Sequence, residues 1–137
     1  MQQSYDGLPL VPNAPTREGV ILEKQERGTL IHATVVDPWV VFSNPVQPAS
    51  TIDSLTLRLR LLAPEMETVQ LYWIPSDDTY FREEHCQRCI VQASNELQDL
   101  TFAFTGNECE RTMLLFRLDP GENPCTMLVE SVTFGRW

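Results

Sequence analysis

Apolar residues alternate with polar residues along much of this chain. The clearest run covers residues 54–62, in which four leucines take turns with threonine and arginine. A period of two fits no helix and is typical of a strand that packs one face on a core and turns the other to water. From Gly19 onward, similar runs rich in β-branched and aromatic residues recur, separated by Gly, Pro, Asn and Asp, which form turns.

These runs predict an all-β fold without a long helix. Residues 26–28, Glu-Arg-Gly, suit a short hairpin connection with glycine at a strained position. Only residues 78–91 compete as a helix, and there Arg82-Glu83-Glu84 could form one or two turns. Eight or nine short antiparallel strands joined by loops predict a two-sheet β-sandwich of jelly-roll type, or a barrel. The expected strands are residues 20–25, 29–36, 39–42, 54–62, 68–74, 89–93, 100–104, 112–118 and 126–134.

The chain has the size and composition of one folded domain. Its 137 residues are 42% hydrophobic and 21% charged, which is ordinary for a globular protein. Residues 1–18 contain three prolines among polar and small residues, and we interpret them as a leader or linker because proline removes a backbone donor. The sandwich domain is expected over residues 19–137.

The charge balance narrows the range of partners. A formal net charge of -9 repels nucleic acid and anionic membrane surfaces. The sequence has no apolar run long enough for a membrane helix, and its first residues lack the features of a secretory signal. We therefore expect no nucleic-acid partner, no membrane insertion and a cytoplasmic location, whereas an oligomer is compatible with the sequence.

Two groups of residues could in principle hold a metal. Cys86 and Cys89 form a CxxC pair, but Cys109 and Cys125 lie sixteen residues apart, whereas structural zinc sites usually bring a second close pair. Reduced thiols are expected, although a disulfide within either pair stays open. The acidic pairs Asp77-Asp78 and Glu83-Glu84 offer calcium ligands, yet their spacing matches no calcium loop. We expect no metal and no cofactor.

Catalytic chemistry finds little support in the sequence. His32 falls within a strand pattern, where a lone histidine is usually a surface or core residue. His85 and Cys86 are neighbours in a predicted extended stretch, so their side chains should point to opposite faces. The chain contains no nucleophile elbow, phosphate loop or paired-histidine motif. The sequence favours a protein that is not an enzyme; a small hydrolase or isomerase would need a deep pocket around a histidine or a carboxylate pair.

Strand alternation predicts one polar outer face. If their strands share a sheet, several outward side chains would offer guanidinium forks, an amide and an aromatic ring, which together suit a sugar ring and its hydroxyls. Ordinary solubilising arginines with salt partners on neighbouring strands would explain the same pattern, and that alternative stays open. Trp39, Trp73 and Phe116 are assigned to the core, whereas Tyr80, Phe81 and Trp137 could be loop or end residues available for contact. The candidate sugar-binding residues are Arg58, Arg60, Gln70, Tyr72 and Arg117.

Four segments carry a family resemblance that covers the chain from about Gly19 to its end. They are LTLRLRLLAP (55–64), VQLYWIPSDDTYFREEH (69–85), LLFRLDPGENP (114–124) and MLVESVTFG (127–135). Their succession resembles the galactose-binding-like, carbohydrate-binding-module-like jelly-roll domains attached to bacterial glycosyltransferases and other polysaccharide enzymes. The resemblance rests on Tyr72-Trp73, on Phe81-Arg82-Glu83 and on the Arg-x-Asp-Pro sequence that begins at Arg117.

The resemblance implies a jelly-roll sandwich and an accessory module that binds carbohydrate without chemistry. Fold analogy alone does not supply a function, so a second class stays open. In that alternative, the sandwich is a structural or protein-interaction module that presents an edge strand or an apolar patch to another chain.

Overall fold

The computed structural model describes residues 2–11, 16–45, 52–75, 80–104 and 113–135, and of Met113 and Leu114 only the backbone. Within these ranges it contains ten strands and one short 3-10 helix, η1 (Glu83–His85). The strands are β1 (Gln2–Asp6), β2 (Val20–Lys24), β3 (Thr29–Ala33), β4 (Val40–Ser43), β5 (Ser54–Ala63), β6 (Met66–Pro75), β7 (Cys86–Gln92), β8 (Gln98–Ala103), β9 (Met113–Asp119) and β10 (Cys125–Gly135).

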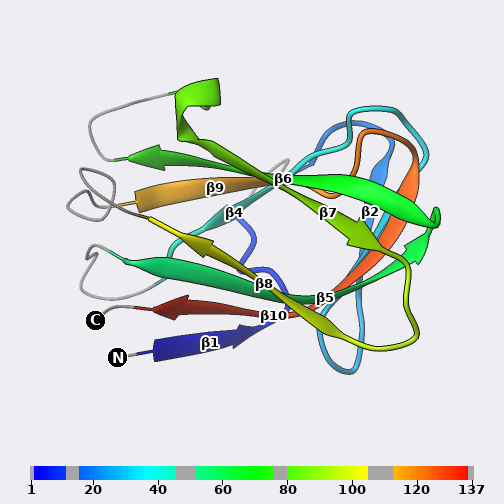
Figure 1. The fold of residues 1–137 in the computed structure, drawn as a ribbon, viewed down its shortest axis with the longest axis horizontal. Helices are drawn as coiled ribbons and strands as arrows, with labels where there is room; N and C mark the ends of the chain where they lie inside the picture. Colours follow the sequence, from blue (N-terminus) through cyan, green and yellow to red (C-terminus); the bar gives the residue numbers. More distant parts are fainter. Residues whose placement is uncertain (1, 12–15, 46–51, 76–79, 105–112, 136–137) are drawn as a thin grey trace.

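The strands form two antiparallel sheets that pack face to face (Figure 1). Sheet A has the order β2-β3-β10-β5-β8, and β1 also pairs with β10; sheet B has the order β4-β9-β6-β7. The long strand β10 borders β5 along one edge, while β3 and then β1 follow each other along its other edge. The predicted two-sheet β-sandwich is confirmed. So is the short hairpin turn, where Gly28 adopts a φ of 99°.

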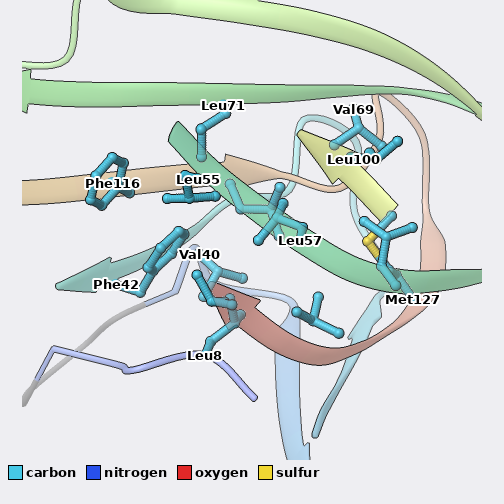
Figure 2. Packing of buried hydrophobic residues seen from close by; sticks show 14 of the residues in the cluster. Leu8, Val40, Phe42, Leu55, Leu57, Val69, Leu71, Leu100, Phe116 and Met127 are labelled. Atoms are coloured by element: carbon cyan, nitrogen blue, oxygen red, sulfur yellow. The ribbon is translucent and has the colours of Figure 1, made fainter. Parts of the chain in front are cut away.

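The core lies between the sheets and is built by the predicted alternation. On β5, Leu55, Leu57, Leu59 and Leu61 are fully buried, whereas Arg58 between them is exposed. Figure 2 shows leucines of β5 close to Leu71 of β6 and to Phe116 of β9, which belong to the opposite sheet. Burying one such side chain contributes about 1.5–3 kcal/mol, so the leucine face of β5 is a main source of stability.

One strand was missed. The prolines and polar residues of 1–18 predict a leader or linker, but Gln2–Asp6 forms β1 and pairs with β10 from Gln2↔Gly135 to Asp6↔Ser131. The segment is polar because it joins the sheet through its backbone, and only Tyr5 packs on the core, edge to face with Phe134. This corrects the secondary structure expected there. The division of the chain at residue 18 into a leader and a domain stays a prediction.

Candidate functional site

A polar hollow of about 470 Å³ opens on the outer face of sheet B. Its floor comes from β6, β7 and β9, and its walls from η1, the segment before β4 and the loop after β9. We call it the Tyr72 hollow. Its lining residues are Arg17, Asp37, Trp39, Gln70, Tyr72, Glu83, Arg88, Arg117, Asp119 and Glu122.

Alternation and strand register together build the floor of the Tyr72 hollow. On β6, Val69 and Leu71 point into the core, which turns Gln70 and Tyr72 outward. In the antiparallel register Tyr72 lies opposite Arg117 of β9, and Gln70 lies opposite both Asp119 of β9 and Arg88 of β7. Directly opposite side chains of antiparallel strands touch, so the register places a phenol, an amide, two guanidinium groups and a carboxylate side by side.

Arg117 is fixed by two neighbours. Its Nε and Nη2 donate to the two carboxylate oxygens of Asp119 at 2.9 and 3.0 Å, a bidentate ion pair. Its guanidinium carbon also lies 4.2 Å from the centre of the Tyr72 ring, a cation–π contact. The guanidinium therefore covers a face of Tyr72, and that face cannot stack on a sugar ring. Tyr72 is only 6% exposed, so little of its ring remains open to a ligand.

The Tyr72 hydroxyl begins a chain of hydrogen bonds along the hollow. It donates to Glu83 Oε1 at 2.9 Å and lies 3.0 Å from Gln70 Oε1. Arg88 in turn pairs with the other oxygen of Glu83. Burial and the bond to Glu83 raise the pKa of Tyr72 well above its ordinary value, while Arg88 and Tyr72 lower the pKa of Glu83. Near neutral pH the phenol keeps its proton and Glu83 is a carboxylate.

Asp119 is held at the edge of the core. It is 8% exposed, and burial raises the pKa of its carboxyl, although the paired Arg117 opposes this shift. The two effects have opposite signs because burial disfavours the charged carboxylate and the neighbouring cation favours it. The pair therefore acts as one unit that fixes the fork of Arg117 over Tyr72.

Trp39 contributes to this hollow, which corrects its assignment to the core. It is half-buried and lines the Tyr72 hollow just before β4. Its carbonyl accepts a hydrogen bond from the Arg17 backbone at 3.2 Å, and the Asp37 backbone donates to the Glu122 carbonyl at 3.0 Å. These bonds tie together the segments that form the wall. Trp73 and Phe116, by contrast, are buried as predicted.

The structure brings together three of the five predicted sugar-binding residues. Gln70, Tyr72 and Arg117 line one hollow on sheet B, whereas Arg58 and Arg60 lie on β5 in sheet A. The assumption that all five share one sheet is wrong, and Arg58 is paired with Asp99 and Glu130. Alternation shows which side of a strand faces water but not which sheet contains the strand. A sugar-binding role for each of the five stays a prediction.

The remaining candidate residues are dispersed. Cys86 and Cys89 are free thiols on opposite faces of β7, since Cys89 packs against the core and Cys86 lies beside the outward Gln70. His32 is exposed and lies 3.0 Å from the Thr126 hydroxyl, while His85 is buried in η1. The described residues contain no cluster of three metal-ligating side chains. Asp77, Asp78, Cys109 and Trp137 lie outside the described residues.

The structure describes only one helical segment, the three-residue η1, and no described helix is long and apolar enough to cross a membrane.

The fold is that of structurally characterised carbohydrate-binding modules. A family 29 carbohydrate-binding module from Piromyces equi superposes with a TM-score of 0.61 at 7% identity, over 98% of this chain and 89% of the module. A xylan-binding module of family 15 superposes with a TM-score of 0.63 at 13% identity, over 98% of this chain and 96% of the module. A low-affinity xylan-binding module of family 86 from Roseburia intestinalis superposes with a TM-score of 0.52 at 12% identity, over 98% of this chain and 94% of the module. The expected sandwich of this type is confirmed.

No protein-family model and no curated protein matches the sequence. At 7–13% identity the structural likeness establishes the fold alone.

Proposed function

We propose that this protein is a non-catalytic carbohydrate-binding module and that the Tyr72 hollow binds its ligand. The observation that carries the proposal is the linked set of planar polar groups along the hollow's floor and wall, in which Arg117, Asp119, Tyr72 and Glu83 hold one another in place. Fixed planar donors and acceptors suit sugar hydroxyls, because little ordering is needed when the ligand binds.

The charges in the hollow favour a neutral sugar. Its lining includes three arginines and four carboxylates. Arg117 and Arg88 are each paired with a carboxylate, and Arg17 donates to the Val36 carbonyl. An added carboxylate would meet four negative groups and would find two of the three arginines already paired, whereas a hydroxyl can both donate to a carboxylate and accept from a guanidinium. We therefore expect neutral oligosaccharides to bind better than acidic ones at this site.

The structural neighbours support this proposal through their stated ligands. Two of them are described as xylan-binding modules, and a substituted family 29 module was solved with mannohexaose. Other structures of that module, titled as probes of ligand recognition, replace an arginine and an aspartate two positions apart. The Tyr72 hollow contains the same pair of residue types at the same separation on β9, Arg117 and Asp119.

Trp39 is the aromatic side chain that we expect to stack on the sugar. Tyr72 is covered by Arg117, whereas Trp39 is half-buried at the wall of the hollow. The C–H face of a sugar ring packs on such an aromatic surface. Titration calorimetry with xylohexaose, mannohexaose and cellohexaose tests the proposal. We expect saturable binding of at least one neutral oligosaccharide, and Trp39→Ala should weaken it about tenfold or more.

A matched control comes from the other sheet. Thr56→Ala removes an exposed hydroxyl on β5 and should leave sugar affinity unchanged. The absence of binding across a broad panel of neutral glycans would contradict the proposal, as would full affinity in the folded Trp39→Ala variant.

One observation favours the alternative, a protein-interaction module. Met66 and Ile90 are 56% and 66% exposed on the outward side of β6 and β7, and adjacent exposed apolar residues are a feature of protein contact surfaces. Light scattering discriminates the protein-interaction hypothesis from the carbohydrate-binding hypothesis. A stable oligomer that dissociates when Ile90→Lys is introduced favours interaction, and a monomer favours sugar binding. The expected cytoplasmic location also stays a prediction, which cell fractionation tests.

A further inference from the structure

Arg60 differs from the other arginines in the middle of the sheets. Arg58, Arg88 and Arg117 each pair with a carboxylate. Arg60 is half-buried, its Nε is buried, and that Nε makes no hydrogen bond within the part of the chain that the structure describes. A buried donor without an acceptor costs about 1–3 kcal/mol, and more when the group is charged. The Arg60 side chain would therefore gain from an acceptor, and an acceptor from outside the chain reaches this Nε when the side chain shifts toward solvent.

Arg60 lines a second hollow, of about 260 Å³, which we call the Arg60 hollow. It lies between the end of β5 and the segment that joins β7 to β8, away from the Tyr72 hollow. Its lining residues are Arg60, Leu61, Leu62, Ala93, Ser94 and Asn95.

The Arg60 hollow is rich in donors and has no acidic lining residue. The Ser94 oxygen already accepts a bond from the Glu96 backbone at 3.0 Å, so its hydroxyl proton is available to a ligand. Asn95 adds an exposed amide. Glu65 and Glu96 are neighbours along the chain, but both are exposed and neither lines the hollow. The lining therefore has one positive charge and no negative charge, which favours an anion in this hollow although the whole protein has a net charge of -9.

The volume and the lining of the Arg60 hollow further restrict the class of ligand that fits it. The hollow is smaller than the roughly 300–1,000 Å³ of sites for drug-sized molecules, so it suits one sugar residue rather than a chain. A carboxylate matches the fork of a guanidinium through two parallel hydrogen bonds. Leu62 is 42% exposed and offers an apolar surface to the C–H face of a sugar ring. We propose that the Arg60 hollow is a second binding site, which takes the carboxylate of a single uronic acid residue.

Nitrogen-15 NMR of the full chain reads the site directly through the Nε–Hε signal of Arg60, which is assigned by its loss in Arg60→Lys. Glucuronate should shift this signal saturably, while glucose and acetate at the same concentration should leave it in place. An equal shift by glucose would show that the carboxylate is not recognised. An equal shift by acetate would show that the site recognises a carboxylate without its sugar ring. Either result overturns the proposal, and so does the absence of any shift with glucuronate.

Variants give a second, independent measurement. Arg60→Gln should lower glucuronate affinity about tenfold or more, because a charge-assisted bidentate pair is lost. Arg60→Lys keeps the charge without the planar fork and should restore only part of the affinity. The control Lys24→Gln alters an exposed, paired cation on β2 of the same sheet and should bind like wild type; equal loss in this control would contradict the assignment.

The two sites can be tested separately. The indole N–H signal of Trp39 reports the Tyr72 hollow and should not respond to glucuronate, whereas it should respond to the neutral oligosaccharides of the proposed function. Failure at one hollow thus leaves the other proposal intact.

Discussion

The guanidinium carbon of Arg117 lies 4.2 Å from the centre of the Tyr72 ring, and the same guanidinium donates two hydrogen bonds to Asp119. One side chain therefore joins β9 to β6 on the outer face of sheet B. The contact covers one face of the Tyr72 ring, and it makes Arg117 a structural residue as well as a candidate binding residue.

Replacing Arg117 with methionine should lower the free energy of unfolding by about 2–3 kcal/mol. The change leaves the mostly buried Asp119 carboxylate without its partner and removes the contact with Tyr72. Urea denaturation at neutral pH measures the loss. The control is Lys24→Met, which removes an exposed ion pair with Asp6 and should reduce stability far less. Equal losses in the two variants would show that the Arg117 pair is no more than a surface ion pair.

Tyr72 should make stability depend on alkaline pH. Its pKa is raised in the folded state, so the folded protein keeps a proton that the unfolded chain loses above about pH 10. The contribution of this proton to the free energy of unfolding is complete below about pH 10 and is lost as the pH rises toward the pKa of Tyr72 in the folded state. Urea denaturation between pH 8 and pH 11, roughly the range around the unfolded value, should show a smaller alkaline loss in Tyr72→Phe than in wild type. Parallel curves would contradict the assignment.

The Cys125 thiol should be inert in the folded protein. It is 3% exposed, and burial raises its pKa to about 12. At pH 8 its thiolate fraction is then about a thousandfold below that of a free cysteine. Labelling with a disulfide reagent, followed by peptide mass spectrometry, should modify Cys125 only after denaturant is added. Labelling in native buffer at the rate of a peptide thiol would show that this end of the core opens readily.

Neighbouring residues of β5 should respond very differently to truncation. Leu57 is fully buried, and Leu57→Ala should cost about 2–5 kcal/mol through lost burial and the cavity that remains. Thr56 points outward and shares a 2.9 Å hydrogen bond with Thr101 at the surface, so Thr56→Ala should cost less than about 1 kcal/mol. Thermal or urea unfolding of the two variants checks this difference. Similar losses would mean that the faces of β5 are not divided between core and solvent.

The strands were predictable where apolar and polar side chains alternate along the sequence. β5 and β6 have one face in the core, and the resulting alternation marks both strands in the sequence. β1 gave no such signal, because backbone pairing with β10 rather than apolar burial holds most of it. Trp39 was misplaced for a related reason. A large aromatic residue next to a strand indicates burial by type alone, and its position at the wall of a hollow depends on loops that the alternation does not describe.

The sequence by itself determined that the chain is all-β and, for strands with an alternating pattern such as β5, which side chains face the core and which face outward, because both follow from local periodicity. It also singled out Gln70, Tyr72 and Arg117 as outward polar groups. Only the tertiary structure decided which strands share a sheet, and it thereby separated Arg58 and Arg60 from the Tyr72 hollow. The physical reason is that sheet order and register arise from pairing between segments far apart in the chain, which no local pattern records.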